Sequence, residues 1–171
     1  MITNNDALLK ILESREQRAI YQSRLIKRYH SSLVSFTLNI PGSQKDSELF
    51  REIHHAGMIE LLNTIKDRAA ILYHEVKFTE TGPEGYICVN ADAIGLKHLT
   101  VNLEATHALG RLFDFDVFND QCKQISRIDV GYSERTCLLC SKNVHICRRE
   151  QNHSIVELLE KINSMATIYF G

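Results

Sequence analysis

The sequence predicts a single α+β domain with a mixed or antiparallel sheet and flanking helices. Three observations favour this class. Residues 33–40 form a β-branched and aromatic run that Pro41 and Gly42 bring to an end. Within residues 49–65, Leu49, Ile53, Gly57, Leu61 and Ile65 then recur at every fourth position, as in a helix with one buried face. Later runs form strand pairs joined by short turns.

The N-terminal third is predicted to be helical in two pieces. A polar run from Glu13 to Arg18 interrupts the apolar stripe that precedes it. Ser14, followed three residues later by Gln17, matches a capping box. We therefore expect a second helix to begin at Ser14 and to continue to about Tyr29.

Two hairpins and two further helices complete the expected domain. The first hairpin joins residues 71–79 to residues 86–90, and the second joins residues 112–118 to residues 124–130. Asp92 and Ser154 stand where each would cap the start of a helix. A length of 171 residues suits one core, so residues 1–171 are expected to form one domain.

Composition narrows the class of partner. The formal net charge of −1 gives no global electrostatic case for binding nucleic acid or an anionic membrane. There is no apolar run long enough to span a bilayer, and residues 1–6 lack the pattern of a signal peptide. The odd number of cysteines, five, favours free thiols or metal ligands over disulfides. We expect a cytoplasmic protein.

An acidic pair is the first candidate site. Residues two apart on a strand point to the same face, so Asp114 and Asp116 are expected side by side, opposite Phe113, Phe115 and Val117. Adjacent carboxylates repel unless a cation lies between them. Mg²⁺, or Mn²⁺ in its place, binds carboxylates together with substrate phosphate oxygens. The alternative is that Asp-x-Asp is simply the solvated face of a half-exposed sheet.

The expected return strand supplies further candidates. Hairpin pairing would bring Asp129 near the acidic pair, as a ligand for a second metal or as the base for an attacking hydroxyl. Arg111 and Arg127 are suited to phosphate oxygens, because a guanidinium group binds them in a bidentate manner.

The segment after residues 33–40 joins a strand to the start of a helix. Such a position offers free backbone amides and a favourable dipole for phosphate, so Lys45 and Ser47 are candidates for binding a triphosphate. The alternative is that Ser43 or Ser47 only caps the helix.

Several motifs together resemble a known family. They are Glu104-x-x-His107-x-Leu109-Gly110-Arg111-Leu112-x-Asp114-x-Asp116-Val117, Leu33-Val34-Ser35-Phe36-Thr37, Pro41-Gly42 with Lys45 and Ser47, Gly82-Pro83-Glu84-Gly85, Ser126-Arg127-x-Asp129 and Arg135-x-Cys137-Leu138-Leu139-Cys140. This combination resembles the holo-citrate lyase synthases, that is, the apo-citrate lyase phosphoribosyl-dephospho-CoA transferases. The likeness extends from about residue 14 to the final helix.

The resemblance implies a nucleotidyltransferase-like fold and activity. Such enzymes transfer 2′-(5″-triphosphoribosyl)-3′-dephospho-CoA to a serine of the citrate lyase acyl carrier protein, the γ subunit, and release pyrophosphate. It implies catalytic roles for Asp114, Asp116, Asp129, Arg111 and His107, and substrate-binding roles for Lys45, Ser47, Gly110, Arg127 and Arg135. For Glu104 and His107, a structural hydrogen bond is the alternative. Two other functions remain open: the same chemistry on the malonate decarboxylase carrier protein, and a non-enzymatic zinc-stabilised module that binds a carrier protein.

A Cys/His-rich loop occupies about residues 135–153. Cys137, Cys140, Cys147 and His153 are ligand types suited to structural Zn²⁺, and the family pattern is similar at all four positions. His145 is an alternative fourth ligand. Reduced thiols packed under a loop are the alternative to a metal site.

Overall fold

The computed structural model describes the backbone of residues 4–171 and the side chains from Leu9 onward. The helices are α1 (Asn4–Tyr29), α2 (Glu48–Lys66), α3 (Ala93–Thr106), α4 (Val144–Arg149) and α5 (Ile155–Phe170). The strands are β1 (Ser32–Leu38), β2 (Ala70–Thr79), β3 (Gly82–Asn90), β4 (Phe113–Phe118) and β5 (Gln124–Ile125), with short helical turns η1 (Gly110–Leu112) and η2 (Ile128–Val130). Residues 1–3, which belong to the N-terminal segment expected to lack a signal-peptide pattern, lie outside the described residues. None of the described helices is long and apolar enough to cross a membrane.

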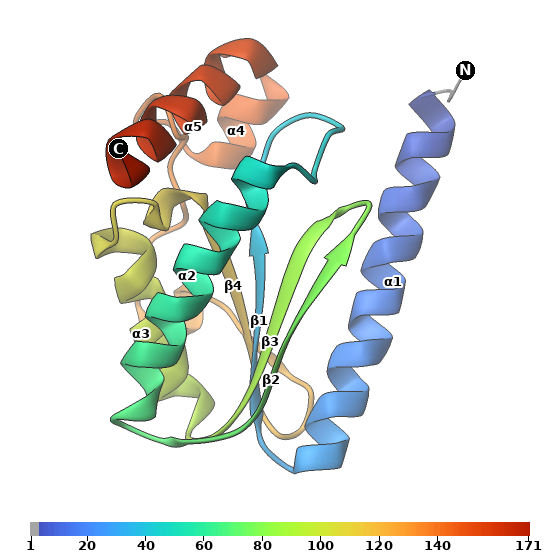
Figure 1. The fold of residues 1–171 in the computed structure, drawn as a ribbon, viewed down its shortest axis with the longest axis vertical. Helices are drawn as coiled ribbons and strands as arrows, with labels where there is room; N and C mark the ends of the chain where they lie inside the picture. Colours follow the sequence, from blue (N-terminus) through green and yellow to red (C-terminus); the bar gives the residue numbers. More distant parts are fainter. Residues whose placement is uncertain (1–3) are drawn as a thin grey trace.

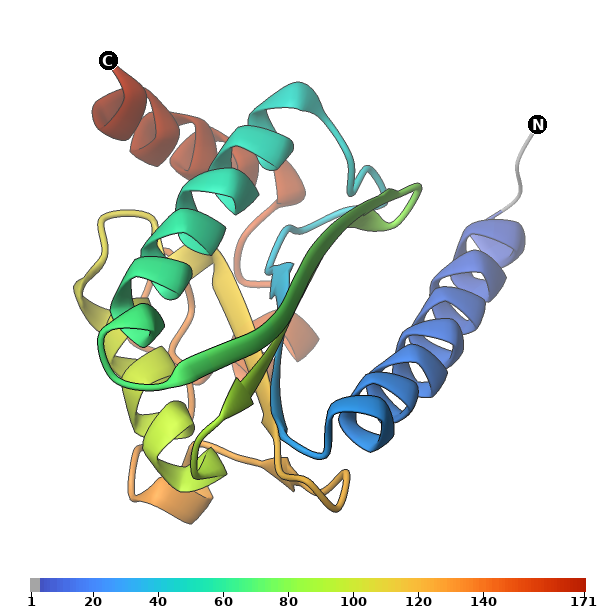
Figure 2. The same cartoon turned by 60° about the horizontal axis from the view of Figure 1, so that its bottom comes forward.

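The sheet has five strands in the order β2-β3-β1-β4-β5, and every neighbouring pair is antiparallel. The α+β class is therefore confirmed, with the antiparallel form of the predicted sheet. Helices α2 and α3 cover one face of the sheet, and α1 lies on the other (Figures 1 and 2). The central strand β1 pairs with both β3 and β4, so it joins the hairpin of β2 and β3 to the acidic strand.

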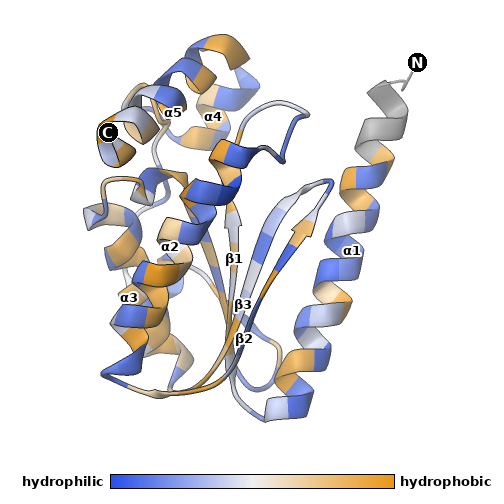
Figure 3. Ribbon diagram, viewed as in Figure 1, coloured by the Kyte–Doolittle hydropathy of each residue, from blue (hydrophilic) through white to orange (hydrophobic). Residues whose placement is uncertain are grey.

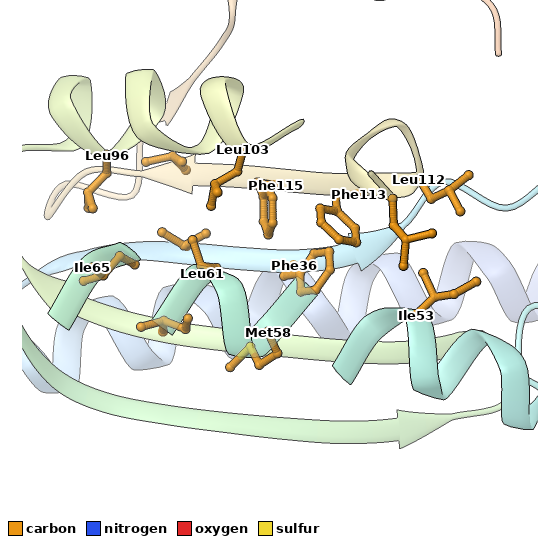
Figure 4. Close-up of a cluster of buried hydrophobic side chains, with 14 of the residues drawn as sticks. Phe36, Ile53, Met58, Leu61, Ile65, Leu96, Leu103, Leu112, Phe113 and Phe115 are labelled. Atoms are coloured by element: carbon orange, nitrogen blue, oxygen red, sulfur yellow. The ribbon is translucent and has the colours of Figure 1, made fainter. Parts of the chain in front are cut away.

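The main core lies between the sheet and α2 and α3. Strand β4 alternates buried and partly exposed residues, and Phe113, Phe115 and Val117 belong to this core. Figure 4 shows the rings of Phe113 and Phe115 within it. Helix α2 approaches closely at Gly57, where an added Cβ would lie 2.6 Å from the Phe36 ring. The apolar face of β4 is therefore buried in the core, and its acidic face is directed toward the α1 side of the sheet.

The predicted break in the N-terminal helix is wrong, because α1 is continuous from Asn4 to Tyr29. The hydroxyl of Ser14 hydrogen-bonds Thr81 at 2.5 Å instead of capping a helix. Arg18 pairs with Glu84 at 2.8 Å. Glu, Arg and Gln are good helix formers, so the polar run interrupts the apolar stripe without interrupting the helix. Figure 3 shows hydrophilic residues recurring along α1.

The predicted return strand over residues 124–130 is also wrong beyond its first two residues. Strand β5 ends at Ile125, and η2 begins at Ile128. The Asp129 carboxylate accepts hydrogen bonds from the Ser126 backbone N–H and hydroxyl, both at 2.8 Å, and Ser126 Oγ accepts from Asp129 N at 3.2 Å. This reciprocal box starts a helical turn, which competes with strand pairing.

His54 makes folding sensitive to acid. Its ring stacks on Phe36 with centroids 4.3 Å apart, and burial lowers its pKa from 6.5 to about 4. Between these values the unfolded chain binds a proton that the folded chain does not, so the free energy of unfolding falls as pH drops. The full loss is about 3 kcal/mol. Denaturant titrations from pH 7 to pH 4 should show this slope, and His54→Leu should flatten it. Equal slopes in the two proteins would refute the assignment.

Candidate active site

Asp114 and Asp116 share the face of β4 that is turned away from α2 and α3, as predicted. Antiparallel pairing sets Asp114 opposite Thr37 and Asp116 opposite Ser35 on the central strand. Gln22 of α1 reaches over this face and donates to Ser35 Oγ at 2.9 Å. The acidic pair thus stands on a polar surface of β4, beside the central strand, with α1 on the same side of the sheet.

The two carboxylates repel each other. Burial, followed by the negative charge of Asp114, raises the pKa of Asp116 from 3.8 to about 6. Gln124 Nε2 donates to Asp116 Oδ1 at 2.7 Å, which fixes that carboxylate in place. A divalent cation between the two groups would remove the repulsion, and the donor set of two carboxylates suits Mg²⁺.

Arg135 reaches the acidic pair from the Cys/His-rich loop. One guanidinium nitrogen donates to Phe113 O at 2.9 Å, and another pairs with Glu104 and lies 3.4 Å from Asp114 Oδ1. Arg127 Nη1 lies 3.5 Å from Glu104 Oε2, so both arginines gather at one end of the strand. Glu104 therefore holds two cations near the start of β4.

The structure gives Arg111 a different set of contacts. Its guanidinium donates to Thr136 O at 2.8 Å and to Cys137 O at 3.0 Å, so it anchors the Cys/His-rich loop. Gly110 packs against the end of α3, where an added Cβ would lie 2.5 Å from Leu103 O. A need for close packing therefore explains this glycine.

His107 lies on the opposite side of β4 from the acidic pair. It ends α3, its Nδ1 accepts from Leu109 N at 3.0 Å, and its ring lies 5.0 Å from the Phe113 ring, which belongs to the core face. Asp129 is held by Ser126, as described above. The structure therefore brings Arg135 to the acidic pair and joins Arg127 to it through Glu104, whereas Arg111, His107 and Asp129 have other partners.

Lys45 and Ser47 lie in the loop that follows β1. Thr37 pairs with Asp114, so this loop leaves the sheet at the Asp114 end of β4. Ser47 caps α2 by accepting from Phe50 N at 3.2 Å, and the Lys45 amine donates to the Ile40 carbonyl. Burial lowers the pKa of Lys45, and the nearby charges of Arg148 and Arg15 lower it further. Three cations from distant segments thus gather at one loop.

The four predicted zinc ligands form one cluster. Cys137, Cys140, Cys147 and His153 place their ligand atoms within 4.8 Å of one another. Two of the sulfurs, Cys140 Sγ and Cys147 Sγ, are 3.8 Å apart. His153 Nε2 is buried without a hydrogen-bond partner, as expected of a nitrogen that binds a metal. This Cys₃His set has the ligand types and number of a tetrahedral metal site. His145 is exposed and outside the cluster.

Two site residues were missed by sequence reasoning. Lys97, from α3, donates to Phe115 O at 2.8 Å, and Gln124 bonds Asp116. Lys97 could have been found from its position, because it lies seven residues before Glu104 on a helix that otherwise buries apolar side chains at that spacing. A charged residue on a buried face needs a partner.

Comparisons with known proteins bear on the whole chain. The family model described as apo-citrate lyase phosphoribosyl-dephospho-CoA transferase matches residues 6–169. A protein of that name from Escherichia coli is 35% identical over 91% of this chain and 86% of its own length. The protein of that name from Shigella boydii has the same identity and coverage. "Protein CitXG" from Haemophilus influenzae is 37% identical over 94% of this chain but only 35% of its own length. The predicted resemblance is confirmed.

Proposed function

This chain belongs to the apo-citrate lyase phosphoribosyl-dephospho-CoA transferase family, and we propose that it transfers 2′-(5″-triphosphoribosyl)-3′-dephospho-CoA to a serine of the citrate lyase acyl carrier protein, the γ subunit. One structural observation supports this chemistry most strongly. Asp114 and Asp116 stand side by side on a polar strand face, and Arg135 lies 3.4 Å from Asp114. Carboxylates for a metal and an arginine for phosphate are the components that phosphoryl transfer requires.

The reaction needs little covalent participation from the protein. The serine oxygen forms a bond to the α-phosphorus, the bond from that phosphorus to the pyrophosphate oxygen breaks, and the hydroxyl proton is released to solvent. The chain's contribution is to orient the triphosphate and to stabilise its charge. Arg135 and Arg127 supply positive charge beside the acidic pair, and Lys45 and Ser47 extend the phosphate site along the loop after β1.

Asp114 and Asp116 would hold Mg²⁺, or Mn²⁺ in its place. Their fit rests on their shared strand face and on their mutual repulsion, which together with burial raises the pKa of Asp116. When bound, the metal neutralises the developing charge of the pyrophosphate leaving group. On these grounds we propose a nucleotidyltransferase-like fold for residues 1–171 as one domain, with Asp129, Arg111, His107 and Gly110 kept as secondary candidates.

We propose Zn²⁺ as the metal of the Cys₃His cluster. Three sulfurs and one imidazole favour Zn²⁺ over the oxygen-seeking Mg²⁺. Arg111 donates to the carbonyl of Cys137, and Arg135 stands two residues before that ligand. The bound metal would therefore fix the position of the segment that carries Arg135.

All five cysteines are free, which fits a reducing cytoplasmic environment. The net charge of −1 argues against nucleic acid as a partner.

A choice of acceptors tests the proposed function. Purified apo carrier proteins of citrate lyase and of malonate decarboxylase would be offered separately with the triphosphoribosyl precursor and Mg²⁺, and pyrophosphate would be measured. We expect release with the citrate lyase carrier and little with the other. The reverse preference would identify the malonate decarboxylase carrier protein as the acceptor. Binding of a carrier by zinc-loaded protein without any pyrophosphate would favour the non-enzymatic binding module.

A further inference from the structure

Strand β4 has an open edge beside the acidic pair. Its other edge pairs with β1 from Leu33 to Leu38, but β5 covers only Val117 and Phe118. The backbone groups of Phe115, which lies between the two aspartates, point to this open edge. Unpaired strand groups in a protein interior are costly, so something else must satisfy them.

Two charged side chains of α3 fill the place of the missing strand. Glu104 Oε1 accepts from Phe115 N at 3.1 Å, and Lys97 Nζ donates to Phe115 O at 2.8 Å. Both residues are only 4% exposed. Since they are seven residues apart on one helix, their side chains leave the same face, two turns apart. Together they hydrogen-bond both the backbone N–H and the backbone carbonyl of Phe115.

These two backbone groups of Phe115 lie next to the two aspartates in the chain. The N–H of Phe115 belongs to the peptide that follows Asp114, and its carbonyl belongs to the peptide that precedes Asp116. Fixing both peptide planes fixes the direction of both Cα–Cβ bonds. We propose that Lys97 and Glu104 are positioning residues that set the spacing of the two aspartates for metal binding, an inference that rests on the proposed function.

The charges of Lys97 and Glu104 explain why neutral residues would not hold the Phe115 backbone equally well. Burying Lys97 and Glu104 costs several kcal/mol per ion unless each is well partnered. Ion pairs with Arg135 and Arg127 offset the cost of burying Glu104, although Glu104 Oε2 has no hydrogen-bond partner. These contacts connect the open edge to the arginines of the site. Outer partners of metal ligands typically change metal affinity by about 10- to 100-fold when removed.

Metal binding by the full chain tests this inference. Mn²⁺ alone would be titrated into wild type, Lys97→Met and Leu96→Ala, and bound Mn²⁺ would be followed by electron paramagnetic resonance at a temperature where all three are folded. We expect Lys97→Met to bind about 10-fold more weakly. Leu96→Ala removes a buried side chain from the same helix without touching β4 backbone groups, so it should lower Tm and leave the Mn²⁺ midpoint unchanged.

Two further variants keep the outcomes distinct. If Lys97→Met does not fold, Glu104→Met provides the test, because methionine removes the carboxylate acceptor of Phe115 N; its midpoint should shift in the same direction. Asp116→Asn should abolish binding. An unchanged midpoint in the folded Lys97 or Glu104 variant, or an equal shift in Leu96→Ala, overturns the positioning role alone. Binding that survives in Asp116→Asn overturns the metal site itself, and the positioning role with it.

Discussion

Asp116→Asn and Asp114→Asn should each lower the rate of pyrophosphate release by about 1,000-fold. Metal stabilisation of transition-state charge contributes several kcal/mol, and each 1.4 kcal/mol corresponds to about tenfold in rate. The two residues act as one unit, so the double variant should be hardly slower than either single one. The measurement is the initial rate of pyrophosphate release with saturating carrier protein and Mg²⁺.

Stability separates this loss of activity from misfolding. Burial and the Asp114 charge raise the pKa of Asp116, so its ionised form opposes folding in metal-free protein. Asp116→Asn keeps an oxygen acceptor for Gln124 and removes the repulsion, so its Tm should equal or exceed that of wild type. Asp120→Asn is the matched control, because Asp120 is exposed in the turn after β4, and it should be fully active. Near-normal rates in both single variants would contradict the assignment.

Loss of a Cys₃His ligand should have the second largest effect. Cys147→Ser should reduce zinc from about one per chain to a small fraction, because a tetrahedral site with a missing ligand binds weakly. Binding of a structural metal is part of the free energy of folding, so Tm should fall by several degrees. Residues 135–153 should become more sensitive to protease, since a bound metal would tie the segments of Cys137, Cys140, Cys147 and His153 together. Zinc would be quantified by elemental analysis after purification without chelators.

Two controls make the zinc result specific. Cys122→Ser changes a thiol outside the cluster and should retain full metal content. His145→Gln should also retain it, because His153 and not His145 completes the cluster. Since Arg135 precedes Cys137 by two residues, Cys147→Ser should also raise KM for the triphosphoribosyl precursor. Wild-type protein without zinc, or a Cys147 variant with unchanged zinc, would count against the site.

Local patterns were sufficient for the parts of the site that depend on one segment. The alternation along β4 is a property of strands, so the shared face of Asp114 and Asp116 could be predicted. The Cys₃His cluster followed from ligand types at short spacing. The prediction for Asp129 depended on how far a hairpin would continue, and the local box with Ser126 ended the strand first.

Contacts between distant segments could not be predicted from the sequence. The helical spacing of Lys97 could indicate a buried charge, but its partner could not be predicted, because no pattern near Lys97 reports that β5 is too short to cover Phe115. Arg111 looked like a phosphate ligand beside the acidic pair, yet it turns to the carbonyl of Thr136, 25 residues further along the chain. Such choices are made by tertiary packing, which overrides local propensity.

The intact mass of the purified citrate lyase γ subunit tests the central claim most directly. It would be measured before and after incubation with this protein, 2′-(5″-triphosphoribosyl)-3′-dephospho-CoA and Mg²⁺, beside a γ subunit whose acceptor serine is replaced by alanine. The account predicts a mass increase equal to the precursor less pyrophosphate, present only when the serine is present and absent with Asp116→Asn. An unchanged mass with folded, metal-loaded protein, or an equal increase with Asp116→Asn, would contradict it.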